Sequence, residues 1–119
     1  MYVPYNPNPA QNKVGDCVIR ALCKALNKPW DEVYCELCAY GYSAKDMPSA
    51  NHVWGRYLAD KGFNRHIIDT DCTVEGFCDC NPQGLFILAI QGHVVCVVDG
   101  HYYDSWDSGQ EIPLYYWER

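Results

Sequence analysis

A β-hairpin near the C-terminal end is the sequence feature that most constrains the fold. Leu85 to Ile90 and Val94 to Val98 are short apolar runs of strand length, and Asp99-Gly100 directly after the second run is a strong two-residue turn signal. A tight turn at this position pairs Val98 with His101. The chain is therefore expected to contain an antiparallel sheet in which the strand after the turn folds back on the strand before it.

The same turn predicts which side chains share a face of that sheet. Continued pairing places His93 opposite Trp106, with Asp104 two residues earlier on the same strand. Because side chains alternate across a sheet, all three lie on one face, whereas His101 points to the other. Asp104 is then the diagonal neighbour of His93, at roughly 7–8 Å or less, which is within side-chain reach. We predict that the Asp104 carboxylate holds the imidazole of His93.

A helix is predicted to begin at Cys17. The apolar residues of this segment repeat with a period of 3.6 and form one face, namely Val18, Ile19, Leu22, Ala25 and Leu26. Gly15 and Asp16 precede it, and Asp16 is a natural N-cap. A helix N-terminus stabilises a thiolate, the reactive form of cysteine, through the helix dipole and the unpaired N–H groups. Cys17 is therefore a candidate nucleophile, although a lone cysteine more often packs as a small hydrophobic residue.

Taken together, these residues resemble the papain-like cysteine peptidases, whose functional residues follow the order Gln, Cys, His, then Asn or Asp. In that family a Gln six residues before the nucleophile contributes its side-chain amide to the oxyanion hole, and Gln11 has this spacing from Cys17. The family's Asn-Ser-Trp-Gly motif corresponds here to the segment 104–107, which reads Asp-Ser-Trp-Asp. The resemblance implies that Cys17, His93 and Asp104 form a catalytic triad, that Trp106 lies at the substrate site, and that no cofactor is needed.

Two residues differ from the family's pattern. Asp16 stands directly before the nucleophile, where the family usually has a small residue, and its carboxylate raises the pKa of the thiol unless it turns away to cap the helix. Asp104 replaces the usual Asn, as in small bacterial and phage members of the superfamily. A carboxylate at that position can orient the histidine and stabilise its imidazolium form.

The length of the chain limits the architecture. With 119 residues, 49% of them hydrophobic, we expect one domain over residues 1–119 and one modest core. The expected fold class is α+β, in a minimal papain-like fold with N-terminal helices packed on a small antiparallel β-sheet. Substrate then lies between a helical part carrying Cys17 and a sheet carrying His93.

The remaining elements follow from local signals. Prolines at positions 4, 7 and 9 predict an extended N-terminal arm over residues 1–11. A second helix is expected from Pro29, with Trp30, Val33, Tyr34, Leu37 and Cys38 on its apolar face and Gly41 as its stop. Further expected elements are a helix over 49–61 ended by Gly62, a strand over 63–68, a short helix over 73–80 and a last strand over 115–117.

Charge and hydropathy limit the classes of partner and the cellular location that we expect for this chain. A net charge of −6 and the absence of a basic stripe argue against nucleic acid. No run of about 18 apolar residues exists, so we expect no membrane span. Residues 1–11 carry neither a basic flank nor an apolar core, so we expect no signal peptide and a cytoplasmic location. The expected partner is a protein or peptide substrate.

Eight cysteines leave other interpretations open. Without an export signal most are expected to be reduced thiols. Cys35 and Cys38 form a Cys-x-x-Cys pair, and a later cluster at positions 72, 78 and 80 can in principle complete a zinc site or form a stray disulfide, although we expect neither.

The expected function is a cysteine peptidase or related thiol hydrolase that cleaves an amide bond through a thioester. The alternatives are a catalytically silent papain-fold binding module and a zinc-stabilised adaptor.

Overall fold

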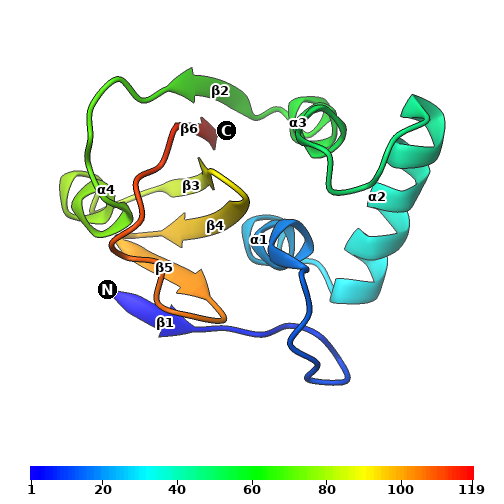
Figure 1. Cartoon of the computed structure of the whole chain (residues 1–119), viewed down its shortest axis with the longest axis horizontal. Coiled ribbons are helices and arrows are strands. Elements are labelled where there is room, and N and C mark those ends of the chain that lie inside the picture. The colour runs from blue at the N-terminus through cyan, green and yellow to red at the C-terminus, as the bar shows by residue number, and fades with distance from the viewer.

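The computed structural model describes all residues, 1–119, and has the α+β architecture predicted from the sequence (Figure 1). The four helices are α1 (Cys17–Leu26), α2 (Trp30–Ala44), α3 (Asn51–Asp60) and α4 (Val74–Cys80). The strands are β1 (Tyr2–Pro4), β2 (Asn64–Ile67), β3 (Leu85–Ile90), β4 (His93–Val98), β5 (His101–Asp104) and β6 (Tyr115–Glu118). They form one six-stranded sheet in the order β1-β5-β4-β3-β6-β2.

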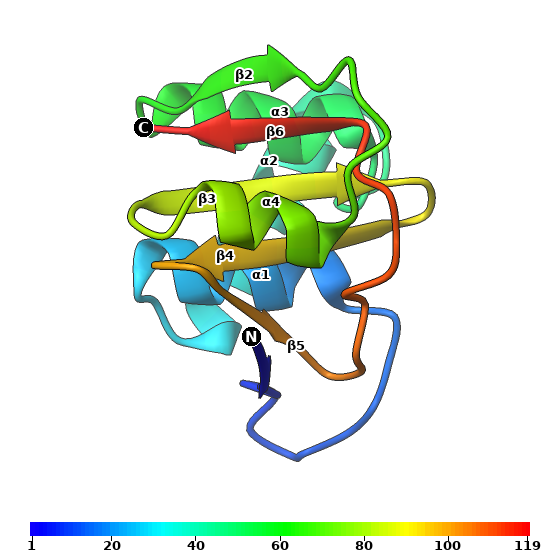
Figure 2. The same ribbon diagram turned by 90° about the vertical axis from the view of Figure 1, so that its left-hand side faces the viewer.

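The sheet is mixed rather than antiparallel as expected, because the N-terminal arm adds a parallel strand, and it has helices on both faces. Every neighbouring pair of strands is antiparallel except β1 and β5, which are parallel. Figure 2 looks onto the sheet from the side of α4, and α1, α2 and α3 lie behind it. The larger core lies on the side of the three helices and includes Leu22, Leu37, Trp54, Ile87 and Cys96. The smaller core lies under α4 and includes Val74, Phe77, Leu88 and Val97.

The hairpin between β4 and β5 confirms the predicted register. Asp99 and Gly100 both have positive φ, 49° and 78°, which is the backbone that a tight two-residue hairpin turn requires. Val98 pairs with His101, as predicted. The ladder ends three pairs earlier than predicted, at Cys96 and Tyr103, and Asp104 pairs on its other side with Pro4 of β1. His93 and Asp104 therefore lie where the two strands are no longer joined by backbone hydrogen bonds.

The N-terminal arm is extended, as predicted, but its first residues also add an edge strand to the sheet. The terminal amino group donates to the carbonyl of Gly100 at 2.9 Å, and the backbone N–H of Tyr5 donates to the carbonyl of Asp104 at 2.8 Å. Pro4 is tolerated because an edge strand needs no N–H donor on its outer side. The arm therefore fixes the backbone of Asp104 from the side opposite β4.

Two expectations about α2 were wrong. The helix does not stop at Gly41 but continues to Ala44 and ends at Lys45, which has a φ of 56°. Gly41 is buried inside the helix, and a Cβ at this position would lie 2.8 Å from the carbonyl oxygen of Asp46. The glycine therefore allows the following loop to pack closely rather than ending the helix. Tyr34, expected on the apolar face, is exposed and stacks on Trp30 with ring centroids 5.0 Å apart.

The other predicted elements are present within one or two residues of their expected ends. The residues expected to be buried on α3, Val53, Trp54, Tyr57 and Leu58, are all buried. Thr73 caps α4, since its Oγ1 accepts a hydrogen bond from the backbone N–H of Gly76 at 3.0 Å. The last strand, β6, pairs with both β3 and β2 and so joins the hairpin to the outer edge of the sheet.

Candidate active site

Cys17 is the first residue of α1, as the apolar periodicity predicted. Its side chain is partly buried. Its backbone N–H has no hydrogen-bond partner in the chain, and neither does that of Val18, because the first turn of a helix has no preceding carbonyls to bond. The thiol therefore lies beside two free N–H donors at the positive end of the helix dipole.

His93 and Asp104 are in direct contact. His93 Nε2 and Asp104 Oδ2 are 2.6 Å apart, and Asp104 is completely buried. The predicted contact between the two side chains is therefore present, although the strands are no longer paired at this point. The contact with Asp104 engages Nε2 and leaves the other ring nitrogen of His93, Nδ1, without a partner, and His93 and Cys17 lie close enough to shift each other's pKa. Cys17, His93 and Asp104 thus lie together in one site.

The electrostatics favour a thiolate–imidazolium pair. Burial raises the pKa of the Cys17 thiol, but hydrogen bonds from His93 and from the backbone N–H of Val94, with the charges of His93 and Arg20, outweigh it and lower that pKa. Burial lowers the pKa of His93, but its contacts with Asp104 and Cys17 outweigh this effect and raise it to about 9. Between these two pKa values the sulfur is negative and the ring is positive.

Asp104 has a partner for each of its acceptor positions. Oδ1 accepts hydrogen bonds from the Arg20 guanidinium at 2.9 Å and from the backbone N–H of Ser105 at 2.8 Å. Oδ2 contacts His93 and accepts from Ser108 Oγ at 2.6 Å. Burial raises the pKa of Asp104, but these hydrogen bonds and the charges of His93 and Arg20 outweigh it and lower the pKa. The carboxylate is therefore held ionised and in one orientation.

Arg20 connects the two carboxylates of the site and was not singled out from the sequence. It is only 4% exposed, and its guanidinium lies 2.8 Å from Asp16 Oδ1 and 2.9 Å from Asp104 Oδ1. Its sequence signal was an arginine inside an otherwise apolar helix, four residues after an aspartate. A buried arginine at such a position needs a partner, and i, i+4 spacing places Asp16 within reach.

Asp16 does not cap α1 with its side chain, contrary to the expectation. Its carboxylate makes no cap hydrogen bond. It instead accepts from Arg20 and, through Oδ2, from the indole N–H of Trp30 at 2.9 Å. Asp16 is nevertheless not among the causes that shift the pKa of Cys17, and its charge is offset by the Arg20 guanidinium.

Trp106 covers the histidine. Its ring centroid lies 4.7 Å from that of His93, with the planes tilted by 44°. The side chain is 44% exposed, although the indole is a large apolar group. One part of the ring therefore shields the imidazole while the rest is available to a ligand.

Gln11 is oriented differently from the expected oxyanion donor. Its Nε2 donates to the carbonyl of Asn8 at 2.9 Å and to that of Asn6 at 3.3 Å. Both amide hydrogens are thus used within its own loop, where Gln11 has a positive φ of 57°. To donate to a substrate at Cys17, the side chain must first release these two carbonyls.

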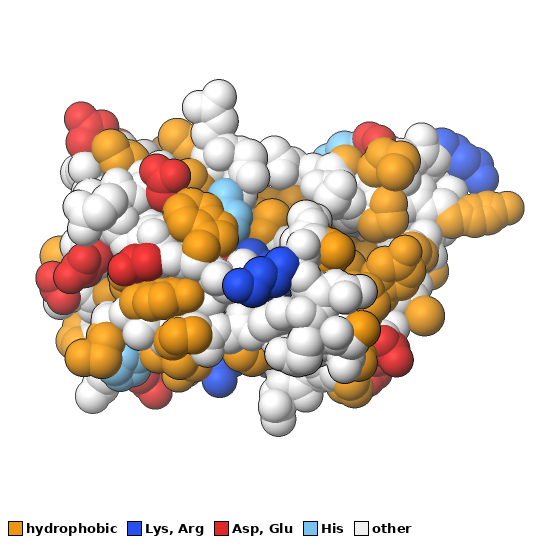
Figure 3. All heavy atoms as spheres, turned by 60° about the horizontal axis from the view of Figure 1, so that its bottom comes forward, with side chains coloured by type: hydrophobic (Ala, Val, Ile, Leu, Met, Phe, Trp, Pro, Cys, Tyr) orange, Lys and Arg blue, Asp and Glu red, His pale blue; other side chains and the backbone are white.

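The surface around the site has a mixed character. Figure 3 shows the face that carries β1 and the loop before α1, where acidic side chains gather toward the left-hand end and no continuous basic stripe crosses. A small hollow of about 140 Å³ lies beside the start of α1 and is lined by residues that include Gly15, Ile19 and Pro48. Two larger hollows, of about 530 Å³ and 570 Å³, lie elsewhere, one on each side of α3.

The cysteines outside the site form neither disulfides nor a ligand cluster. All eight are free thiols. No three His, Cys, Asp or Glu side chains lie together in a way that could hold a metal ion. The structure thus provides no ligand set for the zinc-stabilised adaptor.

No helix combines the length and the apolar character needed to cross a membrane.

Comparisons with protein-family models, curated proteins and solved structures find no match to this chain. The papain-like resemblance thus stays a prediction from the motifs. The chemistry of the site itself is the basis for proposing a function.

Proposed function

We propose that this chain is a cysteine peptidase or related thiol hydrolase with a Cys17–His93–Asp104 triad in a minimal papain-like fold. The observation that carries the proposal is the His93 imidazole 2.6 Å from the fully buried Asp104 carboxylate, together with the partly buried Cys17 thiol, whose pKa His93 lowers. A nucleophile, a base and a group that orients the base are the three parts of this chemistry. The fold contributes a helix carrying the nucleophile on one side and strands carrying His93 and Asp104 on the other.

The first half of the reaction forms a thioester. The Cys17 thiolate attacks the carbonyl carbon of an amide, and the carbonyl oxygen becomes an oxyanion beside the free backbone N–H of Cys17. As the C–N bond breaks, the His93 imidazolium gives its proton to the leaving amine. Asp104 keeps the ring in the orientation that points Nδ1 at the sulfur.

The second half releases the acyl group. Neutral His93 takes a proton from water, the resulting hydroxide attacks the thioester carbonyl, and the sulfur leaves as a thiolate. The products are a carboxylic acid and the regenerated thiolate–imidazolium pair. Trp106 screens one side of the imidazole and offers an apolar wall to a protein or peptide substrate.

Gln11 is proposed as the second oxyanion donor, after it rotates away from the carbonyls of Asn6 and Asn8. An oxyanion donor is typically worth about 10²–10³ in rate. Gln11→Ala is therefore expected to slow acyl transfer by that factor, which exceeds the modest loss of stability expected from its φ of 57° and its two loop hydrogen bonds. An equal loss of rate and stability counts against this role.

A cytoplasmic location is part of the proposal. The eight free thiols are compatible with a reducing compartment, in which disulfides rarely persist. The charge of −6 remains the reason to propose a protein or peptide partner rather than a nucleic acid.

Trapping the acyl-enzyme tests the proposal directly. The protein is mixed with p-nitrophenyl acetate, quenched in acid and digested, and the acetylated peptides are identified by mass spectrometry. The proposal expects a burst of p-nitrophenol and acetylation concentrated at Cys17, both lost in Cys17→Ala and His93→Ala. Cys35→Ser is the matched control, because it removes an exposed thiol far along the chain and leaves the triad intact.

A catalytically silent binding module is the second candidate. The observation that favours it is the Gln11 side chain, whose amide hydrogens are both engaged by its own loop. This candidate expects acetylation spread over the exposed cysteines, with no burst and no dependence on His93. That result overturns the enzyme proposal and directs attention to binding partners.

A further inference from the structure

A second concave site lies between α3 and the outer edge of the sheet. This groove, of about 570 Å³, is lined by the face of α3 that carries Asn51, Gly55 and Arg56 and by Arg65 and Trp117 from β2 and β6. β2 and β6 form the edge of the sheet farthest from β1 and β5 (Figure 2). None of the residues of the Cys17–His93–Asp104 site lines the groove.

The charges in this groove are all of one sign, although the chain as a whole carries −6. Two guanidinium groups, Arg56 and Arg65, line it, and no carboxylate does. Arg56 gives only its Nε to Asp60, at 3.1 Å, so both of its terminal nitrogens have no partner in the chain. The Arg65 side chain makes no hydrogen bond and lies over the ring of Tyr115 at 4.0 Å. The groove therefore offers the whole guanidinium group of Arg65 and the two terminal nitrogens of Arg56, whose Nε is paired with Asp60.

Trp117, which lines the groove, carries a buried donor without an acceptor. Trp117 is 8% exposed, and its indole Nε1 has no hydrogen-bond partner. The neighbouring ring atom, Cζ2, would lie 3.2 Å from a Cβ at Gly55, so the glycine lets α3 approach this edge of the indole. A buried N–H without a partner is costly, and native structures rarely leave one without a reason.

Asn51 presents a further donor at the end of the groove. Its Oδ1 accepts a hydrogen bond from the indole N–H of Trp54 at 3.1 Å, which fixes the amide so that its Nδ2 hydrogens remain unused. The backbone N–H of Asn51, the first residue of α3, also has no partner, and no acidic residue lies in that first turn. All the unused polar groups named here are donors.

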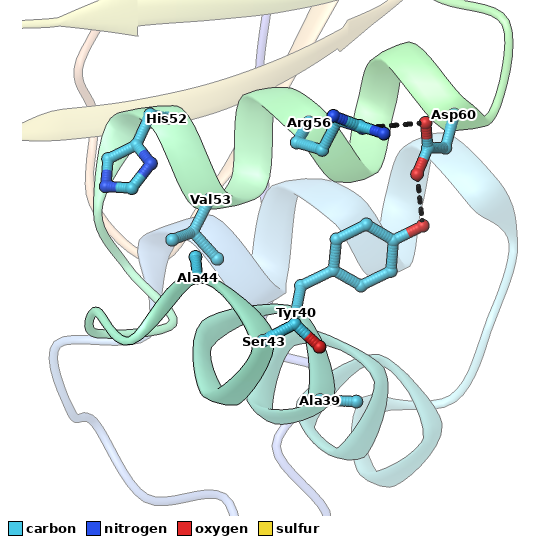
Figure 4. A pocket seen from close by; sticks show the side chains of 8 residues that line it. All are labelled: Ala39, Tyr40, Ser43, Ala44, His52, Val53, Arg56 and Asp60. Carbon is cyan, nitrogen blue, oxygen red and sulfur yellow. Dashed lines mark hydrogen bonds and ion pairs between the residues drawn. The ribbon is translucent and has the colours of Figure 1, made fainter.

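We propose that this groove binds a phosphoryl group. Two guanidinium forks match the oxygens of a phosphate bidentately, and a dianion gains more from two such groups than a carboxylate does. The neighbouring hollow between α2 and α3, of about 530 Å³, is less suited to an anion. There the Asp60 carboxylate already binds Arg56 and Tyr40 (Figure 4).

The proposal is independent of the hydrolase activity and is tested by binding alone. ¹⁵N-labelled full-length protein is titrated with inorganic phosphate at constant ionic strength, and the indole N–H signals of the four tryptophans are followed by NMR. Trp117→Phe assigns its signal by removing the N–H while keeping an aromatic ring. Phenyl phosphate and acetate are titrated in parallel, to separate a phosphorylated aromatic ligand from free phosphate and from a carboxylate.

We expect a saturable shift of the Trp117 indole signal with phosphate and little response to acetate. Arg56→Gln and Arg65→Gln should each weaken binding about 10- to 100-fold, since hydrogen bonds to charged groups are worth roughly 1.5–3 kcal/mol. Lys13→Gln, which removes an exposed charge outside the groove, should leave the affinity unchanged. The proposal is overturned if phosphate and acetate act alike, or if the lysine and arginine variants lose the same affinity.

Discussion

Arg20 should contribute more to stability than any exposed ion pair of the chain. Arg20→Met keeps the approximate length of the side chain but removes the charge that lies between Asp16 and Asp104. Two carboxylates in buried surroundings then lose a shared partner, and Asp104 has no exposure to water with which to compensate. Removing one member of a buried ion pair typically costs about 3–5 kcal/mol.

This cost can be read as a shift in melting temperature. For 119 residues, an unfolding entropy of roughly 2.1 cal/mol/K per residue makes 1 kcal/mol equal to about 4 °C. Arg20→Met is thus expected to lower Tm by roughly 12–20 °C. Urea unfolding followed by tryptophan fluorescence gives the free energy of unfolding, and a thermal melt gives the Tm.

The chain provides a matched control for this substitution. Arg56 and Asp60 have the same i, i+4 spacing as Asp16 and Arg20, but the Arg56 side chain is 74% exposed. An exposed pair is worth about 0–1 kcal/mol, so Arg56→Met should have little effect on stability in phosphate-free buffer. Adding Asp16→Asn to Arg20→Met should recover part of the loss, because one uncompensated carboxylate is removed. Similar, small losses in Arg20→Met and Arg56→Met would refute the buried bridge.

Three further predictions concern the candidate site and Gly41 of α2. Alkylation of Cys17 should begin below the usual pH range of a thiol, and its onset should shift to higher pH in His93→Ala. Acyl transfer should decline as pH rises through about 9, where the imidazolium loses its proton. The pH–rate profiles of the two processes test both expectations. Ser108→Ala should cost about 1–2 kcal/mol in urea unfolding and slow acyl transfer, because Asp104 loses a buried 2.6 Å hydrogen bond. Gly41→Ala should destabilise the protein by about 1–3 kcal/mol in a thermal melt, since the added Cβ would lie 2.8 Å from the carbonyl oxygen of Asp46. Gly15→Ala is the control, and it should be close to neutral because there is open space around Gly15.

Local periodicity was sufficient to predict the parts of the site that lie on regular elements. The start of α1 at Cys17 followed from a 3.6-residue pattern, and the contact of His93 with Asp104 followed from a two-residue turn and strict alternation along the strands. Both inferences use short-range geometry that is the same in every helix and hairpin. The turn at Asp99 was decisive, because a shift of one residue would have placed His93 and Asp104 on opposite faces.

The missed features depend on contacts between distant segments. Arg20 meets Asp104 across 84 positions of the chain, and no local pattern encodes that distance. Ser108 bonds Asp104 from the loop after β5, whose path is not set by any periodicity. β1 was missed because Pro4, which lies within it, weakens a strand pattern, although an edge position tolerates a proline. Gly41 was taken for a helix stop because its tight packing against the Asp46 carbonyl cannot be seen in the sequence.

Asp16 and Arg20 explain each other. Alone, Asp16 would place a carboxylate beside the thiolate and raise its pKa, and Arg20 alone would be an unpaired charge in the core. Together their charges neutralise each other. The other terminal nitrogen of the Arg20 guanidinium binds Oδ1 of Asp104, the oxygen that His93 does not contact. The helix that carries Cys17, α1, is thereby joined to the strand that carries Asp104, β5. In a chain too short for two lobes, this buried bridge fixes the separation of the two layers on which the proposed chemistry depends.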